Sequence, residues 1–401
     1  MSETFKPGAA RALFLSTTAF AVAFAVWGLI SGLAPTFATT YGLSAKMKGL
    51  MIAIPVLLGS LGRIPAGMLT DRFGGRRVFT ALLVGSAIPA VAIGLSTSYL
   101  QLLWLGLFLG MAGTTFAVGV GFTSKWFAPD KQGLALGVFG MGTIGQSIAV
   151  FGAPVLVLQL GSWRPVFFIF AAVSFVWGVI FYIFARDAKS EAKPKTIAEN
   201  LNLLRTSPMA WVLSLFYFVT FGGFVAFSIY LPTLLRDQFG LSPADAGART
   251  AGFVILATLM RPVGGILADR FTGGKVLLVV FVAIAGFALM MGGVWMPTFT
   301  VGALGAASVL GLGSGAVFKL VPQYFPKEVG TATGLVGAFG GLGGFFPPLV
   351  LGVIHDVTGG YTFGFVFLSV FASFCLGVTY FVLVRPGSGA SRQPLLSRVA
   401  V

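Results

Sequence analysis

Two arginines stand inside long apolar stretches of the chain. Arg63 lies eight residues before Asp71, and Arg261 lies eight residues before Asp269. In a helix that rises 1.5 Å per residue, each arginine is about 12 Å from the aspartate that ends its apolar stretch. A guanidinium is planar and presents paired donors, which suit a planar anion with several oxygens. Nitrate, nitrite, formate, bicarbonate and oxalate all fit this description.

These two arginines have no acidic partner at a comparable depth. All 11 Asp and Glu residues fall at the ends of apolar stretches, in connections or in the N-terminal tail. Snorkelling is the alternative, but a side-chain stem of roughly 6–7 Å covers only about half of the depth. A charge in hydrocarbon costs about 2.5–3.5 kcal/mol on insertion scales, and two facing guanidiniums also repel each other. We therefore expect a bound anion to neutralise them.

The composition is that of a polytopic membrane protein. Of 401 residues, 57% are hydrophobic and 9% are charged, whereas a soluble domain carries about 25% charged residues. The single cysteine, Cys375, excludes a disulfide scaffold. The net charge of +15 does not indicate a nucleic-acid-binding protein, because the cations occupy short gaps between apolar runs and not one wetted face. One histidine and one cysteine cannot supply a haem or iron–sulfur enzyme.

Twelve apolar runs are long enough to cross a bilayer as helices. One crossing needs about 20 residues, and runs of this length are too long for the strands of a β-barrel. We predict an all-α integral membrane protein with twelve transmembrane helices in two six-helix, pseudo-symmetric halves. Kinks are expected in the glycine-rich spans. The predicted spans cover residues 12–36, 46–70, 77–96, 99–124, 131–159, 163–186, 208–237, 244–269, 274–294, 297–320, 330–356 and 360–385.

The two halves are repeats of one another. Residues 41–44, Tyr-Gly-Leu-Ser, match residues 239–242, Phe-Gly-Leu-Ser, which lie 198 positions later, and the same offset relates residues 63–78 to 261–276. Because each half has six spans, the repeats share one orientation, an arrangement found in secondary transporters with a site between the halves. The predicted divisions are an N-terminal half, a polar cytoplasmic linker, a C-terminal half and a cytoplasmic tail, at residues 1–186, 187–207, 208–385 and 386–401.

The positive charges follow this topology. With the N-terminus inside, 18 of the 26 Lys and Arg residues fall in cytoplasmic segments and five fall on the other side. The remaining three, Arg63, Arg261 and Lys319, lie within spans. By the positive-inside rule both termini are cytoplasmic. We expect a multi-pass protein of the cytoplasmic (inner) membrane that is surrounded by the lipid bilayer.

The connection after the second span carries a motif that the second half repeats. Residues 67–77 read Gly-Met-Leu-Thr-Asp-Arg-Phe-Gly-Gly-Arg-Arg, and residues 265–273 read Gly-Ile-Leu-Ala-Asp-Arg-Phe-Thr-Gly. This motif resembles the loop 2–3 signature of the major facilitator superfamily. The alternative is that these charges only flank a span and obey the positive-inside rule. The resemblance implies pairing across a cytoplasmic gate by Asp71, Arg72, Arg76, Asp269 and Arg270.

Glycines are concentrated in the fifth and eleventh spans. They recur there at three- and four-residue spacing, which allows helix backbones to approach closely. The run Gly-Gly-Leu-Gly-Gly-Phe-Phe-Pro-Pro at residues 340–348, with Ser-Leu-Phe-Tyr-Phe-Val-Thr-Phe-Gly-Gly at 214–223, is similar to sequences of the nitrate/nitrite porter family. The resemblance extends over essentially all twelve spans.

This second resemblance implies a set of anion-binding residues. Arg63 and Arg261 would hold the anion's oxygens from the two halves, Tyr217 would donate a hydrogen bond, and Phe221 and Phe116 would enclose the flat ion. The glycine signatures add Gly142, Gly145, Gly340 and Gly343. The chain departs from the family at Thr143, where the signature usually has Asn. A threonine hydroxyl is shorter and has one donor instead of two, so its contact with substrate is an open question.

Lys319 is the third cation within a span, three residues before Pro322. Two interpretations stay open, because the side chain can snorkel to the cytoplasmic interface or act as an accessory cation that attracts anions toward the central site. The sequence predicts no metal or cofactor, and we expect a monomer.

The predicted mechanism is alternating access around the anion. An empty site leaves two unpaired cations, which favours exchange of nitrate for nitrite over return of the empty carrier. Proton-coupled nitrate uptake is the alternative, although no buried acid is evident for it, and a carrier of oxalate or formate is another. A non-transporting anion sensor is disfavoured by the short linker and tail.

Overall fold

The computed structural model is a helical bundle, and it describes residues 7–43, 45–188, 197–241 and 243–385. Within these ranges all regular structure is helical. The expected tail, residues 386–401, and residues 189–196 of the linker lie outside the described residues. The described residues include twelve helical spans that are long and apolar enough to cross a membrane. The prediction of an all-α protein with twelve transmembrane helices is therefore confirmed.

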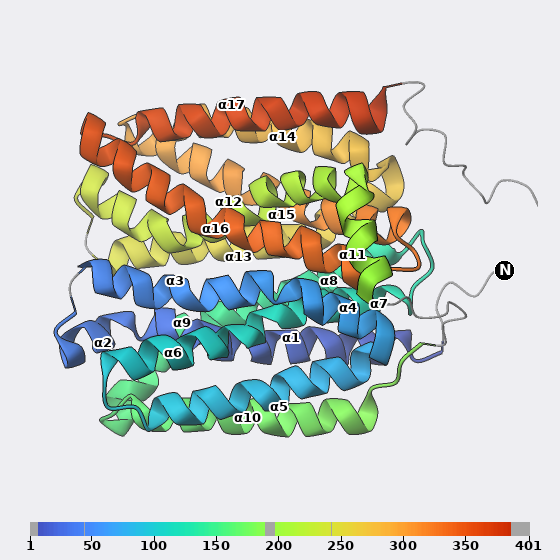
Figure 1. Cartoon of the computed structure of the whole chain (residues 1–401). Helices are drawn as coiled ribbons and strands as arrows, with labels where there is room; N and C mark the ends of the chain where they lie inside the picture. Colours follow the sequence, from blue (N-terminus) through green and yellow to red (C-terminus); the bar gives the residue numbers. More distant parts are fainter. Residues whose placement is uncertain (1–6, 44, 189–196, 242, 386–401) are drawn as a thin grey trace, which may run out of the picture.

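The helices of the first half form one group (Figure 1). In the figure they run from blue to green below the helices of the second half. Several spans consist of two consecutive helices, such as α1 and α2. The first-half elements are α1 (Ala9–Gly32), α2 (Ala34–Tyr41), α3 (Ala45–Leu61), α4 (Arg63–Phe73), α5 (Gly75–Gly94), α6 (Tyr99–Leu109), the 3-10 turn η1 (Gly110–Thr114), α7 (Thr115–Ser124), α8 (Gln132–Gly140), the 3-10 turn η2 (Met141–Thr143), α9 (Ile144–Leu160) and α10 (Arg164–Phe184).

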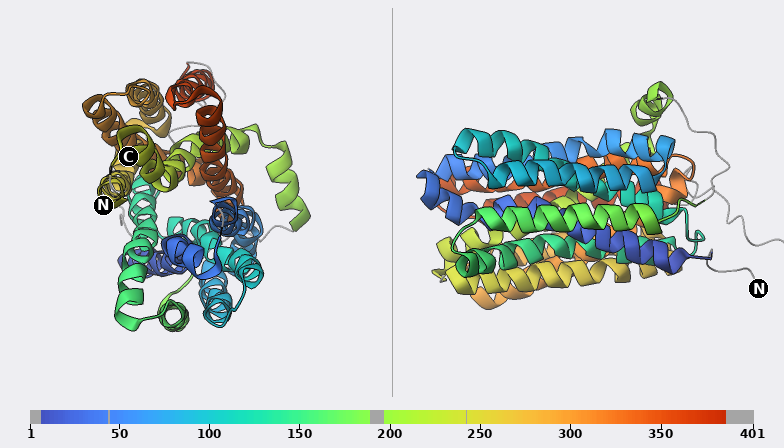
Figure 2. Two further views of the ribbon diagram at one scale, coloured as in Figure 1. Left: turned by 90° about the vertical axis from the view of Figure 1, so that its left-hand side faces the viewer. Right: turned by 90° about the horizontal axis from the view of Figure 1, so that it is seen from below.

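The helices of the second half form the other group, and Figure 2 shows the two groups end-on. The described part of the linker forms the short helix α11, which projects sideways from one end of the bundle. The elements are α11 (Ile197–Thr206), α12 (Pro208–Phe239), α13 (Pro243–Phe271), α14 (Gly273–Met291), α15 (Met296–Tyr324), α16 (Val329–Thr358), α17 (Thr362–Thr379) and the π-helical turn η3 (Tyr380–Val384).

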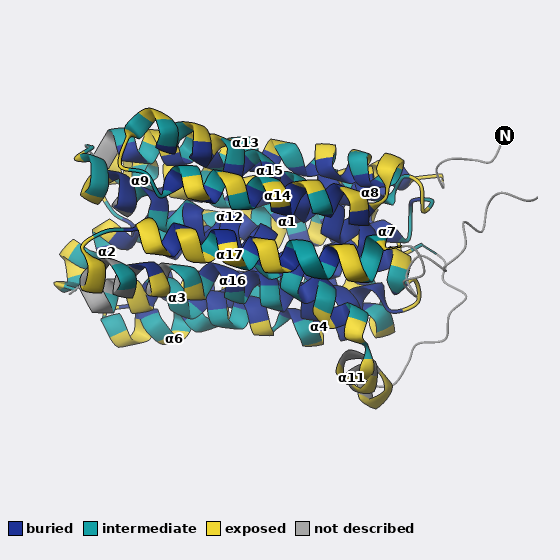
Figure 3. Cartoon of the chain, turned by 90° about the horizontal axis from the view of Figure 1, so that it is seen from above, coloured by how far each residue is buried: buried dark blue, intermediate teal, exposed yellow. Residues whose placement is uncertain are grey.

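The start of α1 and the end of α17 lie at the same end of the bundle (Figure 1). We call this the terminal end and the other the opposite end. Buried residues face the interior of the bundle, whereas exposed residues alternate with them along the peripheral helices (Figure 3). Exposed apolar side chains such as Phe175, Val279 and Phe367 are the pattern expected where hydrocarbon is the solvent.

Breaks in several spans position side chains near the middle of the bundle. The 3-10 turns η1 and η2 interrupt the fourth and fifth spans, and Gly62 separates α3 from α4 directly before Arg63. At Gly110, in η1, a side chain would clash with the carbonyl of Pro55 in α3. The glycine-rich fifth span is therefore interrupted at η2, whereas the eleventh span is the continuous helix α16.

The sequence repeat has a conformational basis at the helix ends. Gly42 and Gly240, 198 residues apart, both cap a helix with left-handed backbone, at φ 60° and 66°. Glycine adopts this conformation without steric cost. Gly74 and Thr272 are also 198 residues apart, and both have positive φ, at 86° and 75°. Thr272 is the single non-glycine residue with positive φ in the described chain. The second half therefore keeps the backbone shape of the first at this position, although threonine adopts it with strain.

Candidate functional site

Four helices bring the two halves into close contact near the centre. α4 of the first half packs on α16 of the second, and α8 of the first half packs on α13 of the second. A side chain at Gly67 would clash with the carbonyl of Gly330, and one at Gly265 would clash with that of Gly133. Only glycine permits backbones this close. The two contacts are related by the internal repeat, so the arginines of α4 and α13 lie at one shared interface.

Arg63 is the first residue of α4 and is 2% exposed. Its Nε donates to the carbonyl of Gly113 at 3.2 Å, and its Nη1 donates across the interface to the carbonyl of Gly337 at 2.6 Å. The guanidinium carbon lies 5.4 Å from the ring centre of Phe116 and 5.5 Å from that of Phe221. Arg63 is therefore held by carbonyls of both halves.

Arg261 on α13 is equally buried, at 2% exposure, but it has fewer partners. Its Nη1 donates to the carbonyl of Gly140 at 3.1 Å, whereas its Nε and Nη2 have no hydrogen-bond partner. Its guanidinium carbon lies 5.1 Å from the ring centres of Phe221 and Phe224. Phe221 thus stands within cation–π distance of both arginines.

Aromatic rings enclose the space between the arginines. Phe116, Tyr217 and Phe221 are nearly parallel, with interplanar angles of 2–8°. Phe318 meets Phe116 and Tyr217 edge-on, with centroids 4.8 and 4.5 Å away. The hydroxyl of Tyr217 is buried and has no hydrogen-bond partner. A cavity of about 10 Å³ lies beside Tyr217, Arg261 and Phe318, about the room of one water molecule.

The site has donors in excess of acceptors. The ion pairs in the described part of the chain involve other residues, and neither buried arginine takes part in one. Three donor atoms, on Tyr217 and Arg261, remain without a partner. Buried polar groups are nearly always satisfied, so the arrangement is chemically suited to a small anion with acceptor oxygens.

The residues expected from the glycine signatures divide into two groups. Gly340 lies against the ring of Tyr217, whereas Gly343 packs α16 on α12, where its added side chain would meet Phe218 and Gly222. Gly142 and Gly145 lie against α1, so their contacts in the structure are with that helix and not with an arginine.

Thr143 is buried, and its hydroxyl donates to the carbonyl of Gly140 at 3.1 Å, the carbonyl that also accepts from Arg261. It therefore lies one contact away from the guanidinium.

Sequence reasoning missed several residues of the site. Phe224 and Phe318 had no distinguishing signal among 41 phenylalanines. The carbonyls of Gly140 and Gly337 belong to the glycine-rich spans, but a backbone acceptor leaves no mark in the sequence beyond the glycine itself. Gly113 lies in η1, whose position was not expected.

Asp71, at the terminal end of α4, binds the start of α16 across the interface. Its carboxylate accepts from the backbone N–H groups of Gly330 and Thr331 at 3.1 and 2.7 Å. Lys125 lies 3.7 Å from the same carboxylate. The first N–H groups of a helix have no intrahelical partner and carry a partial positive charge, so a carboxylate there is stabilising.

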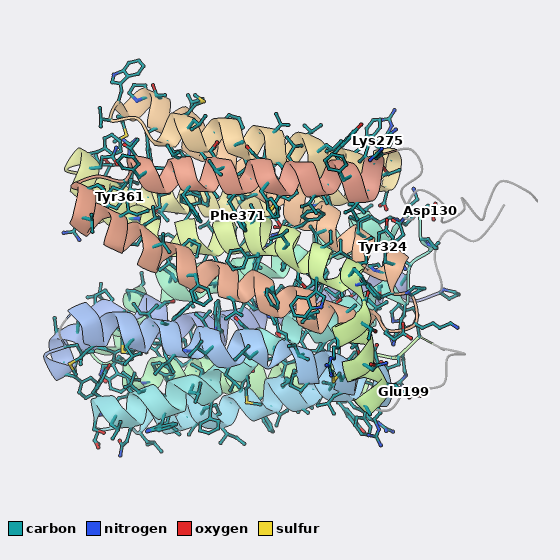
Figure 4. All side chains as sticks on the ribbon, turned by 45° about the horizontal axis from the view of Figure 1, so that its top comes forward. Asp130, Glu199, Lys275, Tyr324, Tyr361 and Phe371 are labelled. Atoms are coloured by element: carbon teal, nitrogen blue, oxygen red, sulfur yellow. The ribbon has the colours of Figure 1, made fainter. Side chains whose placement is uncertain are left out.

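Asp269 makes the equivalent contact from the second half to the first. It accepts from the backbone N–H groups of Gly133 and Leu134, at the start of α8, at 3.1 and 2.9 Å. Lys319 lies 2.7 Å from Asp269 and also donates to the carbonyl of Pro129. The ammonium of Lys319 is therefore paired at the terminal end, and a role as an accessory cation in the anion path stays a prediction. Asp130 and Tyr324 mark that end in Figure 4.

The arginines of the repeated motif do not reach across the interface. Arg72 and Arg270 each lie 5.2 Å from the ring of the adjacent phenylalanine. Arg76 contacts the end of the sixth span, where its Nε donates to the carbonyl of Tyr182 at 2.7 Å and its backbone N–H donates to Asp187 at 3.0 Å. The polar contacts between the halves described at this end are therefore made by Asp71, Asp269 and Lys319.

This architecture is that of a membrane transporter, and the chain belongs to the Major Facilitator Superfamily, whose family model matches residues 15–321 and 213–398. Solved structures share the fold. The human organic anion transporter MFSD10 (TETRAN) aligns with a TM-score of 0.76 at 17% identity, covering 93% of this chain and 100% of that chain. The transporter FucP in the outward conformation aligns at 0.72 and 17% identity, covering 92% and 99%.

Curated relatives are similar over nearly the whole chain. The "Nitrite extrusion protein" of Bacillus subtilis (strain 168) is 40% identical over 369 residues, covering 91% of this chain and 92% of the relative. The "Probable nitrate/nitrite transporter NarK2" of Mycobacterium tuberculosis (strain CDC 1551 / Oshkosh) is 41% identical over 378 residues, covering 90% and 93%. The resemblance to nitrate/nitrite porters is thus confirmed at the level of related sequences.

Proposed function

We propose that this protein carries nitrate and nitrite across the cytoplasmic membrane, with the anion held between Arg63 and Arg261. The observation that supports it most directly is the set of buried donors without acceptors, at Tyr217 and Arg261. A planar oxyanion can accept hydrogen bonds from these donors in its own plane, and the cavity of about 10 Å³ beside them must widen to admit it. The names of the relatives support nitrate and nitrite as the cargo.

Transport proceeds by alternating access of the two six-helix halves. The terminal end faces the cytoplasm, in line with the distribution of Lys and Arg. Asp71 and Asp269 then hold the cytoplasmic side closed, because each bridges a helix of one half to a helix start of the other. Opening requires both bridges to break and the glycine contacts of Gly67 and Gly265 to separate.

Exchange of one anion for the other follows from the electrostatics of the site. Without an anion, two buried guanidiniums face aromatic rings, and no acid among the described residues pairs with them. The closed, empty carrier is therefore high in free energy, and the halves reorient with an anion bound. The binding residues all come from one chain, so a monomer suffices.

Counterflow in liposomes tests this function. Purified protein is reconstituted with nitrite inside, and nitrate is added outside at a clamped pH. We expect nitrite efflux only when nitrate is present outside, and little competition by formate or oxalate. Rapid uptake of nitrate into vesicles without internal anion, driven by a pH gradient, would instead establish proton coupling and overturn the exchange proposal. Displacement of nitrate by oxalate at equal concentration would reassign the cargo.

A further inference from the structure

An apolar cavity lies away from the proposed anion site, in the second half. It has a volume of about 340 Å³ and is formed between α12, α16 and α17. A water molecule needs only about 10–15 Å³ in this measure. Every residue that lines the cavity is apolar, so it offers a water molecule no side-chain hydrogen bond. We call this cavity the groove, and its apolar lining disfavours a polar ligand.

The groove has a buried floor and an exposed rim. Val219, Phe227 and Phe365 form part of the floor and are nearly inaccessible, whereas Phe346 and Phe367 on the rim are 49% and 60% exposed. The rim continues into the exposed apolar face of α17, which is one of the transmembrane spans. The groove is therefore an indentation in the surface that contacts lipid.

The position of the groove across the membrane indicates which leaflet supplies the lipids that can enter it. Its residues on α17 extend from Gly364 to Phe371, in the first half of a helix that begins at the opposite end. Phe371 lies near the middle of the bundle and Tyr361 lies at its opposite end (Figure 4). The groove thus spans the hydrocarbon depth of the leaflet at the opposite end, where phospholipid chains are the surrounding solvent.

We propose that this groove binds one acyl chain of a membrane phospholipid from that leaflet. The chain buries its methylene groups against the floor, and each buried methylene contributes favourably. α12 connects this groove to the transport site, because Phe218 and Val219 line the groove while Tyr217 and Phe221 line the anion site. The lipid chain is in this way part of the packing behind the anion-binding helix.

Photo-crosslinking tests the assignment on the full chain in bilayers. The probe is phosphatidylethanolamine with a diazirine in its acyl chain, and mass spectrometry locates the labelled residues. We expect labelling concentrated on the groove segments of α16 and α17, and one phospholipid retained through detergent washing in native mass spectra. Labelling should fall at least fivefold in Ala226→Phe, which fills the floor, and in Phe367→Ala, which removes a rim residue without overpacking.

Phe175→Ala on α10 is the matched control, because Phe175 is an exposed apolar residue, at 50%, outside the groove. It should leave the groove labelling unchanged. Even labelling of all lipid-facing helices, or undiminished labelling in both groove variants, would overturn the proposal. So would a dimer in native spectra whose contact protects the groove, since the occupant would then be a second copy. These readouts do not depend on transport, so they stand apart from the proposed function.

Discussion

Arg63 and Arg261 differ in how much of their hydrogen-bonding capacity the protein itself uses. Arg63 donates to carbonyls of both halves, whereas Arg261 keeps Nε and Nη2 without a partner. The donors that remain for an anion are therefore concentrated on Arg261. Arg63 contributes its charge and also holds the two halves together.

Lysine in place of either arginine should abolish most nitrate/nitrite counterflow, because an ammonium is a point charge without the planar pair of donors. Arg63→Lys should also lower the melting temperature more than Arg261→Lys, since it loses two charge-assisted bonds to carbonyls. Counterflow and thermal unfolding of the purified variants measure the two effects. Normal counterflow in both variants would refute the assignment of the site.

Tyr217→Phe should weaken anion binding by roughly 10–100-fold, the value of a hydrogen bond to a charged group. The hydroxyl has no protein partner, so its removal should leave the melting temperature unchanged or slightly higher in the absence of anion. Anion-induced stabilisation, measured by thermal shift against nitrate concentration, gives the change in affinity. A large loss of stability without anion would show that the hydroxyl has a structural role instead.

Helix packing at the interface depends on glycines that leave no room for a methyl group. Gly67 on α4 faces Gly330 on α16, and Gly265 on α13 faces Gly133 on α8. These pairs close the bundle toward the terminal end, next to the aspartate bridges. In the proposed cycle, the helices that must separate are therefore pairs with a backbone-to-backbone contact.

Gly67→Ala and Gly265→Ala should hinder closure of the terminal end and reduce counterflow at least tenfold. Gly286→Ala on α14 is the matched control, because nothing lies within 4 Å of the added carbon, and alanine is the better helix former. Accessibility of single cysteines placed at the terminal end reports the open state. Equal accessibility in all three variants would contradict a gating role for these contacts.

The two aspartate bridges are built alike but differ in burial. Lys319 is 10% exposed and 2.7 Å from Asp269, whereas Lys125 is 25% exposed and 3.7 Å from Asp71. Removing one partner of a buried pair leaves an uncompensated charge.

Asp269→Asn should therefore lower the melting temperature more than Asp71→Asn, and both should increase cysteine accessibility at the terminal end. Asp245→Asn provides a control, because Asp245 forms an exposed pair with Arg249 on one helix. An Asp269→Asn variant as stable as this control would show that the bridge contributes little.

The Lys and Arg residues of the molecule fall into groups with different positions. Most Lys and Arg residues flank spans, two arginines face the proposed anion site, and Lys319 joins the bridge at the terminal end. The carboxylates of Asp71, Asp245 and Asp269 pair with cations other than the two buried arginines. The transport cycle consequently has no described carboxylate in contact with the anion site to carry a proton.

Nitrate/nitrite exchange should accordingly vary little between about pH 6 and 8, the range in which histidine and perturbed acids titrate. The rate of nitrite efflux against external nitrate, with pH equal on both sides, measures this. An inward proton gradient should not drive net nitrate accumulation. A rate that rises steeply on acidification would point to a titrating group in the path.

Composition and periodicity determined the class, the twelve spans and the repeat, because apolar runs of about 20 residues cross hydrocarbon as helices. They also singled out Arg63 and Arg261, since a charge at that depth requires compensation. The family resemblance identified Tyr217, Phe221 and Phe116, which the structure brings together with both arginines.

Tertiary structure alone decided which groups share a contact. The carbonyls that hold the arginines, the edge-on ring of Phe318, the pairing of Lys319 with Asp269 and the orientation of Gly142 toward α1 depend on distances between helices remote in sequence. Such contacts arise from packing across the two halves, where glycine brings backbones together. The local sequence records that glycine is present, but not which helix it faces.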